Sequence, residues 1–167
     1  MDWRLSGFGA VRSHRPTLNQ IVPGLLVGEY PNLEDLPWLR DDHGVTAIVS
    51  LQDDADLASK RLRLADIERA CAATGLAFHR HPIMDGDPEA LAYALRHIAA
   101  VLDELLISGA CVYLHCNAGY NRAPTVAIAF LHAHRQLSIP AATALVKERR
   151  PCVPYASAVE RAFAPCS

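Results

Sequence analysis

The sequence predicts an α/β fold in which a central sheet is flanked by helices. Short apolar runs near residues 45–51, 77–83 and 111–115 have the length of strands. Segments with apolar residues at helical spacing separate these runs, and this alternation is typical of a sheet covered by helices. The chain has 167 residues, 51% of them apolar and 20% charged, which is enough to bury the core of one domain.

The first part of the chain predicts an arm followed by a strand pair. Residues 1–17 contain scattered Gly, Ser, Arg and His without periodicity, which is typical of an arm or a tail. The folded domain is therefore expected to occupy residues 18–167. Two short apolar pieces within residues 21–27 surround the turn residues Pro23 and Gly24, and this pattern predicts a small strand pair at a sheet edge.

The next segment predicts a helix, a buried strand and an acidic loop. Asn32 is a suitable N-cap for a helix that ends near His43, with Gly44 behind it. Residues 45–51 are a continuous apolar run, as expected for a strand covered on both faces. Residues 52–56 are expected to be a solvated acidic loop rather than a metal site, because no His or Glu completes an oxygen cage.

The middle of the chain predicts a further helix and strand. Residues 65–74 repeat apolar residues at helical spacing, and residues 77–83 alternate as a strand does. Residues 79–81, His-Arg-His, are expected to lie on the solvent face of an edge strand, and the alternative is that the histidines line a phosphate pocket.

The C-terminal half predicts the remaining helices and the last strand. Residues 88–107 are the longest segment with helical periodicity, and all of its apolar positions are expected to serve the core. A strand leads to Cys116, an apolar helix covers residues 122–134, Ser138 caps another helix, and a short helix is expected over residues 157–163.

The stretch from Val112 to Thr125 carries the chemistry. A short apolar strand runs into Cys116, a loop with Gly119 follows, and a helix begins at Arg122. Amides at the start of a helix have no partners within it, so together with the helix dipole they can bind an oxyanion. Thiols at helix N-termini or beside Arg have a lowered pKa. Cys116 is therefore expected to be a nucleophilic thiolate at neutral pH.

Each position of this loop suits phosphate binding. The expected phosphate ligands are the loop amides and one guanidinium, from Asn117, Ala118, Gly119, Tyr120, Asn121 and Arg122. The planar fork of Arg122 can hold two phosphoryl oxygens at once, which a Lys cannot do. Gly119 allows a positive φ that turns the amides inward, and Pro124 loses no hydrogen bond in the first helical turn.

Residues 115–122 read His-Cys-x-Ala-Gly-x-x-Arg, between an apolar strand and an apolar helix. This motif resembles the signature of the cysteine-dependent protein tyrosine phosphatase superfamily, specifically its dual-specificity branch. Residues 122–124, Arg-Ala-Pro, and the downstream segment 149–154 look most like the phosphoglucan phosphatases of that branch. The resemblance covers roughly residues 21–163. It implies a single-domain dual-specificity-phosphatase-like fold with a mixed sheet of about five strands, no metal and no cofactor, and a His115 that hydrogen-bonds within the loop.

A phosphatase also needs a carboxylic acid to protonate the leaving oxygen. Asp87 directly precedes Pro88, so it is best explained as the N-cap of the following helix. Asp85 has no such structural role and lies beside Gly86, so it is assigned as the general acid. The resemblance supports this assignment, because the family's acid also lies in a loop between a strand and the long helix that leads to the Cys strand.

The expected reaction is a two-step hydrolysis. Cys116 attacks phosphorus, Arg122 and the loop amides hold the developing charge, and Asp85 protonates the leaving oxygen and then activates water. Most dual-specificity phosphatases place Ser or Thr directly after the Arg, whereas this chain has Ala123, as phosphoglucan phosphatases do. The missing hydroxyl predicts that breakdown of the phosphocysteine is slower than its formation.

A phosphorylated protein is the expected substrate, with phosphoglucan, other sugar phosphates and inositol phosphates as alternatives. The family's glucan-stacking aromatics would fall near Gly86 and Val153, which cannot stack, so Tyr120 and Tyr155 are the available replacements. The loop has no Lys or second Arg for further phosphates, which disfavours phosphoinositides. Residues 149–150, Arg-Arg, are expected beside the active-site rim, which in relatives contributes to substrate choice.

Two rival functions belong to other classes. A phosphate-binding pseudophosphatase would need only the loop, whereas this chain also has the cysteine, the arginine and an acid. Thiol redox chemistry, such as arsenate reduction, would need a resolving cysteine. Cys111 lies on the same strand as Cys116 and is poorly placed, which leaves Cys152 as the other candidate.

Composition excludes several other functions. The net charge of −2 disfavours general binding to nucleic acid or to anionic membranes. The five cysteines show no close pairs typical of a zinc site or a disulfide scaffold. No signal peptide and no run of about 18 apolar residues is present, so no membrane insertion is expected. Because a catalytic thiol needs a reducing compartment, the sequence predicts a cytoplasmic protein.

Overall fold

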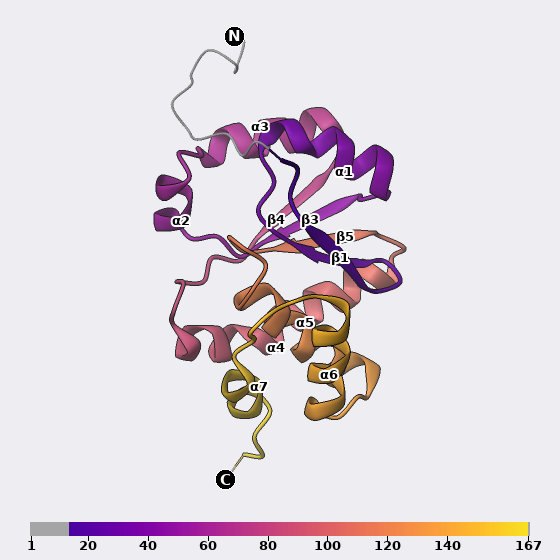
Figure 1. The fold of residues 1–167 in the computed structure, drawn as a ribbon, viewed down its shortest axis with the longest axis vertical. Helices are drawn as coiled ribbons and strands as arrows, with labels where there is room; N and C mark the ends of the chain where they lie inside the picture. Colours follow the sequence, from indigo (N-terminus) through magenta and orange to yellow (C-terminus); the bar gives the residue numbers. More distant parts are fainter. Residues whose placement is uncertain (1–13, 167) are drawn as a thin grey trace.

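The computed structural model describes residues 14–166, so most of the predicted N-terminal arm lies outside the described residues. A five-stranded mixed sheet forms the centre, in the order β1-β2-β5-β3-β4 (Figure 1). The strands are β1 (Leu18–Val22), β2 (Leu25–Gly28), β3 (Ala47–Ser50), β4 (Ala77–Arg80) and β5 (Val112–His115). Only the β1–β2 pairing is antiparallel among these strands, and the other three pairings are parallel. The predicted α/β fold with a mixed sheet of about five strands is confirmed.

Helices cover both faces of the sheet (Figure 1). They are η2 (Leu33–Asp35), α1 (Leu36–His43), α2 (Asp54–Ser59), α3 (Leu64–Thr74), α4 (Pro88–Ile107), α5 (Arg122–Arg135), α6 (Ile139–Arg149) and α7 (Ala156–Ala162). The helices α4 to α7 lie below the sheet in Figure 1, and α1 and α3 lie above it. Two apolar clusters correspond to these two layers, the larger one beneath the sheet.

The central strand β5 shows why the core has two sides. Successive side chains of a strand point to opposite faces. Val112 and Leu114 belong to the cluster shared with α4 and α5, and Tyr113 belongs to the cluster shared with α1 and α3. All four residues of β5 are buried.

The parallel register brings three strand ends to one edge. His115 at the end of β5 pairs with Gly28 at the end of β2 and with Ser50 at the end of β3. Cys116 follows directly at this carboxyl edge, between the end of β5 and the start of α5. Ligands of open α/β sheets bind at this edge, so the topology places the phosphate loop where the sequence predicts a site.

Two expected elements differ in the structure. The predicted strand over residues 77–83 ends at Arg80, because its neighbour β3 ends at Ser50. The segment predicted as a solvated acidic loop instead begins α2 at Asp54, with Asp53 as its N-cap. Asp56 in that helix is only 6% exposed, so the prediction of a solvated segment was wrong at this residue.

The helices within residues 14–166 include none with the length and apolar character needed to cross a membrane.

Candidate active site

The phosphate loop, defined as residues 116–122, surrounds a small pocket at the carboxyl edge of the sheet. The pocket has a volume of about 40 Å³ and is lined by Asp85, Cys116, Asn117, Ala118, Tyr120, Asn121 and Arg122. Cys116 is 3% exposed. Gly119 has a φ of 61°, the positive value expected for the turn. The structure therefore brings together the predicted nucleophile and the predicted arginine, both in this loop, and the predicted acid, which comes from the segment after β4.

The carbonyl groups of the loop face outward and are hydrogen-bonded there. Three backbone amides donate to them: Tyr30 N–H to Asn117 O at 2.9 Å, Val153 N–H to Tyr120 O at 2.9 Å and Thr125 N–H to Asn121 O at 3.2 Å. The guanidinium of Arg150 donates to the other two, from Nη2 to Ala118 O at 3.0 Å and from Nε to Gly119 O at 2.6 Å. In a trans peptide the C=O and the next N–H point in opposite directions. The outward carbonyls thus direct the following amides toward the pocket.

These inward amides are available to a ligand. Within residues 14–166, no backbone N–H of residues 117–122 donates a hydrogen bond to another protein group. Buried or half-buried amides are ordinarily paired, and free amides at a helix N-terminus are the usual setting of a bound phosphate. The loop is accordingly organised as an oxyanion site at the start of α5.

One nitrogen of the Arg122 side chain makes no hydrogen bond to the described residues and can donate to a ligand. Its Nη1 donates to Asp56 Oδ2 at 2.7 Å and to Ile83 O at 2.7 Å, and its Nη2 donates to Asp56 Oδ1 at 3.3 Å. Its Nε is buried and has no hydrogen-bond partner among the described residues, although Asp85 Oδ1 lies 3.4 Å away. A buried unpaired donor on the wall of a pocket marks the place of a missing acceptor, and a phosphoryl oxygen would satisfy it.

Asp56 holds the arginine in place, a role that the sequence reasoning missed. Its Oδ1 accepts from Asn117 Nδ2 at 2.6 Å and from Arg122 Nη2, and its Oδ2 accepts from Asp53 N–H at 2.9 Å and from Arg122 Nη1. The Asp53–Asp56 spacing is a reciprocal capping box. The sequence shows that spacing, but it does not show that Asp56 also binds Arg122, which lies 66 residues away along the chain.

The charges of this cluster stabilise one another. Burial disfavours ionisation of Asp56, yet the hydrogen bonds from Arg122 and Asp53 outweigh it and lower the pKa of Asp56. Burial likewise opposes the charge of Arg122, but the hydrogen bond to Asp56 and the nearby charges of Cys116, Asp56 and Asp85 raise the pKa of Arg122. The arginine is therefore a permanent cation at the pocket.

The side chain of Asn117 belongs to the same support and not to the phosphate ligands. Its Oδ1 accepts from Gln52 Nε2 at 2.8 Å while its Nδ2 donates to Asp56. Only its backbone N–H can reach the anion. Gln52 and Asp56 together fix the first residue of the loop after the cysteine.

The two candidate acids occupy different positions. Asp87 Oδ1 accepts from the N–H groups of Glu89 at 3.1 Å and Ala90 at 2.9 Å, so its predicted role as the N-cap of α4 is confirmed. Asp85 is largely exposed, lines the pocket and forms an ion pair with Arg122 Nε. Gly86 between them has a φ of 75°. Of the two carboxylates, Asp85 is thus the one that lines the pocket.

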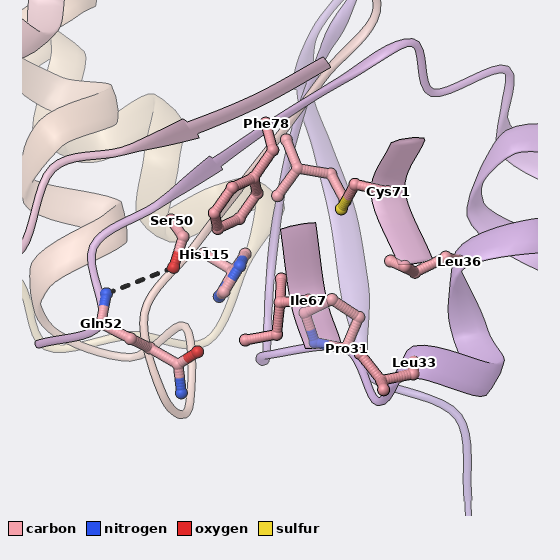
Figure 2. Close-up of a pocket in the computed structure, with 10 residues that line it drawn as sticks. Pro31, Leu33, Leu36, Ser50, Gln52, Ile67, Cys71, Phe78 and His115 are labelled. Atoms are coloured by element: carbon pink, nitrogen blue, oxygen red, sulfur yellow. Dashed lines mark hydrogen bonds between the residues drawn. The ribbon is translucent and has the colours of Figure 1, made fainter. Parts of the chain in front are cut away.

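His115 lies between the phosphate loop and a second cavity, which Figure 2 shows. Its Nδ1 lies 2.9 Å from Cys116 O, and because a carbonyl only accepts, this nitrogen must carry the proton. The cavity also contacts Ser50 and Gln52, which Figure 2 joins by a hydrogen bond, and the apolar residues Phe78 and Cys71. Its volume of about 10 Å³ is at the lower limit for one water molecule. The residues around this cavity support the loop, and the cavity itself has no room for a ligand.

The remaining cysteines differ from Cys116 in their surroundings. Burial raises the pKa of Cys71 to about 11. Burial also raises the pKa of Cys152, although the positive charges of Arg150 and Lys147 partly offset it. All cysteines are free within the described residues. A raised pKa makes a thiol a poor partner in thiol exchange, which disfavours the redox alternative.

Three exposed apolar side chains lie at or next to residues that line the pocket. Met84, Tyr120 and Val153 are 62%, 45% and 53% exposed, although large apolar side chains are usually buried. Val153 is tied to Tyr120 through its backbone N–H. Tyr155, the other proposed stacking residue, packs against the apolar core instead, so Tyr120 is the aromatic ring available at this rim. The described residues also contain no group of three His, Cys, Asp or Glu side chains that could hold a metal ion.

Comparisons with known proteins agree with this geometry. A family model described as dual specificity phosphatase, catalytic domain, matches residues 25–159. An amyloplastic phosphoglucan phosphatase, DSP4 of Castanea sativa, is 31% identical over 163 residues, which is 93% of this chain and 43% of that protein. The chain therefore spans less than half the length of that relative.

Two further similarities extend over the whole fold. A phosphatidylglycerophosphatase and protein-tyrosine phosphatase 1 of Homo sapiens is 25% identical over 152 residues, covering 83% of this chain and 67% of the relative. The crystal structure of Tk-PTP in its active form matches with a TM-score of 0.73 and 25% identity, over 89% of this chain and 94% of that one.

Proposed function

The chain belongs to the dual specificity phosphatase family, whose members are metal-independent, cysteine-based phosphatases, and we propose that it hydrolyses phosphomonoesters through a phosphocysteine. The observation that carries this proposal is the pairing of a thiol with unsatisfied donors. The free amides of residues 117–122 and the Nε of Arg122, which makes no hydrogen bond among the described residues, line the same pocket as Cys116. A bound phosphoryl group would satisfy them all.

In the first step, Cys116 Sγ attacks phosphorus and the ester P–O bond breaks. The loop amides and Arg122 hold the equatorial oxygens, where charge spreads in the transition state. Asp85, which lines the pocket, gives its proton to the leaving oxygen. Asp56 keeps the guanidinium in position through two hydrogen bonds and so acts without touching the substrate.

In the second step, the ionised Asp85 takes a proton from a water molecule, whose oxygen attacks phosphorus. The P–S bond breaks, and the electron pair returns to Cys116. No hydroxyl from the residue after Arg122 stabilises this leaving thiolate, because that residue is Ala123, which is fully buried. We therefore expect this step to be slower than the first.

A phosphorylated protein side chain, and phosphotyrosine in particular, is the substrate class that the rim favours. Met84, Tyr120 and Val153 offer exposed apolar surface at or next to residues that line the small anion-binding pocket. An aromatic leaving group could pack on these side chains, since apolar contact removes them from water. No Lys or second Arg lines the pocket to bind a further phosphate.

Phosphoglucan is the second candidate, and two observations favour it. The segment Arg122-Ala123-Pro124 has the form found in phosphoglucan phosphatases, and one relative with that printed function is 31% identical. Tyr120 is the exposed aromatic at the rim that could stack on a sugar ring. A phosphoglucan would need to be held largely by this one ring.

The experiment that tests the proposal compares substrates on one protein. Release of phosphate is measured from phosphotyrosine and phosphoserine peptides, phosphoinositides and phosphorylated glucan, beside Cys116→Ser. We expect release from phosphotyrosine peptides and none with Cys116→Ser. Tight binding of phosphopeptide without turnover would instead identify a pseudophosphatase, and activity with phosphoglucan alone would reverse the order of the two candidates.

We also propose that residues 18–167 form the catalytic unit and that the protein works in a reducing compartment such as the cytoplasm. The first part is supported by β1, which begins at Leu18. The second is supported by the chemistry, because a thiolate nucleophile must stay reduced.

A further inference from the structure

Arg150 is a buried cation without an acidic partner. It is 5% exposed, and its guanidinium donates four hydrogen bonds, all to neutral oxygens. The acceptors are Gly119 O at 2.6 Å, Ala118 O at 3.0 Å, Asn19 Oδ1 at 3.0 Å and Thr17 Oγ1 at 3.3 Å. Among residues 14–166, no carboxylate forms an ion pair with it. Buried charges are normally paired, so this arrangement calls for a physical reason.

The sequence explains how Arg150 reaches the loop. A residue before proline avoids helical backbone angles, and Arg150 precedes Pro151. Helix α6 accordingly ends at Arg149, and Arg150 adopts extended angles of −142° and 130° while its N–H closes the last turn onto Val146 O. Arg149, one residue earlier, remains helical and exposed. This segment was expected beside the active-site rim, and Arg150 does contact the phosphate loop there, through the outward carbonyls of Ala118 and Gly119.

The two loop carbonyls that Arg150 holds determine the direction of two amides. The C=O of Ala118 shares its peptide plane with the N–H of Gly119, and the C=O of Gly119 shares its plane with the N–H of Tyr120. Because the peptide is trans and planar, an outward carbonyl forces the opposite N–H inward. Arg150 is close enough to Gly119 that a Cβ there would lie 2.7 Å from Arg150 Nη2.

We propose that Arg150 is a positioning residue of the phosphate loop. It aims the amides of Gly119 and Tyr120 into the pocket, and its charge, which no acid of the described residues neutralises, adds to the positive field that a phosphate dianion meets there. The guanidinium also joins the loop to the start of β1 through Asn19 and Thr17. This inference rests on the proposed function, since it assigns a supporting role within that same site.

Two substitutions separate the geometry from the charge. Arg150→Lys keeps the charge but cannot bond all four acceptors at once, because an ammonium has three N–H donors at one point instead of the five donors of a planar fork. Arg150→Gln loses the charge as well. Arg149→Lys and Arg149→Gln are matched controls, because Arg149 is adjacent and exposed and is not among the described residues that line the pocket. Asn19→Ala removes the contact with β1 and leaves both loop carbonyls paired.

The protein of residues 1–167 is titrated by calorimetry with tungstate, an oxyanion whose binding needs no turnover. The kcat and KM for p-nitrophenyl phosphate are measured on the same proteins. Misplacing reacting or binding groups by about 1 Å can lower catalysis by on the order of 100-fold. We expect Arg150→Gln to weaken tungstate binding and to lower kcat/KM by roughly 10- to 100-fold. The tungstate affinity and kcat/KM of Arg150→Lys should lie between those of Arg150→Gln and of the wild type. The same two quantities should stay within about twofold of the wild type in the Arg149 controls and in Asn19→Ala.

Several outcomes would overturn the proposal. A purely structural role would lower the melting temperature of both Arg150 variants while the folded proteins bound tungstate as the wild type does. If Asn19→Ala lost as much tungstate affinity as Arg150→Gln, the contact of Arg150 with β1, and not its contact with the loop carbonyls, would be responsible. Should Arg150→Gln not fold, tungstate affinity of Arg150→Lys decides the question. A wild-type protein that binds tungstate but cleaves no substrate would refute the proposed function, and the Arg150 comparison would still stand on tungstate alone.

Discussion

Replacing Asp56 by Asn tests whether a buried carboxylate holds Arg122 in place at the pocket. The substitution keeps the shape of the side chain and removes its charge. Each carboxylate oxygen of Asp56 accepts two hydrogen bonds, one of them from Arg122. An amide has only one acceptor oxygen, so its NH₂ must face two donors whichever way the group is turned.

The expected loss of stability follows from these contacts. The side chains of Arg122 and Asp56 are 2% and 7% exposed. Removing one partner of a buried ion pair typically destabilises a protein by 3–5 kcal/mol. We expect about 3 kcal/mol, the lower end of that range, because Arg122 keeps its bond to Ile83 O and borders a pocket open to water. We also expect kcat/KM to fall by on the order of 100-fold as the guanidinium moves.

The assay combines urea unfolding with steady-state kinetics on p-nitrophenyl phosphate at a temperature where both proteins are folded. The control is Asp54→Asn, because Asp54 is two residues away in the same helix and its side chain is 93% exposed. Loss of its surface ion pair with Arg80 should change the stability by about 0.5 kcal/mol or less. The kinetics of this control should match those of the wild type.

The pH dependence supplies an independent check. The pKa of Asp56 is lower in the folded protein than in the unfolded chain, so the native state binds fewer protons and stability rises with pH. The advantage of the wild type over Asp56→Asn should be complete above the unfolded value of about 3.9 and should disappear as the pH falls through the lower folded pKa. A stability difference that does not change across acidic pH, or an Asp56→Asn enzyme with wild-type kcat/KM, would refute the reasoning.

Four other outcomes are expected. Asp85→Asn should lower kcat by roughly 10²- to 10⁴-fold for an alkyl phosphate and by less for p-nitrophenyl phosphate, whose leaving group needs little protonation. Gly119→Ala should abolish oxyanion binding, measured by tungstate titration, because its Cβ would lie 2.4 Å from a backbone oxygen at a φ of 61°. Ala123→Ser should remove the pre-steady-state burst predicted for the wild type and raise kcat by roughly tenfold, the value of one hydrogen bond to a charged group. Iodoacetate at neutral pH should label Cys116 before Cys71, whose pKa is raised to about 11; equal labelling by mass spectrometry would contradict this.

The loop and the position of Asp85 at its pocket could be predicted because their signals are local. The spacing from Cys116 to Arg122 lies within one turn and one helix start, so the residues that meet are near in sequence. Asp85 and Asp87 were separable because Pro88 identifies the helix start that Asp87 caps. Each of these interpretations needed only short-range rules of capping and turn formation.

Asp56 and Arg150 could not be assigned because their partners are remote. An acidic segment is usually solvated, and nothing near Asp56 in sequence indicates that Arg122 lies opposite it. Residues 149–150 are two adjacent arginines, and only the helix stop before Pro151 separates a buried one from an exposed one. Predicting these contacts would require knowing how α2 and the end of α6 pack around β5, which local patterns do not determine.

The phosphate loop therefore depends on more of the chain than its motif. The motif supplies the thiol, the guanidinium and the amides, but the direction of the amides is imposed by donors from outside it. Those donors are Tyr30 after β2, and Arg150 and Val153 after α6. Catalytic dipoles are effective when they are oriented before the substrate arrives. Since these donors belong to the fold and not to the substrate, substitutions behind the loop should change transition-state binding without touching the substrate.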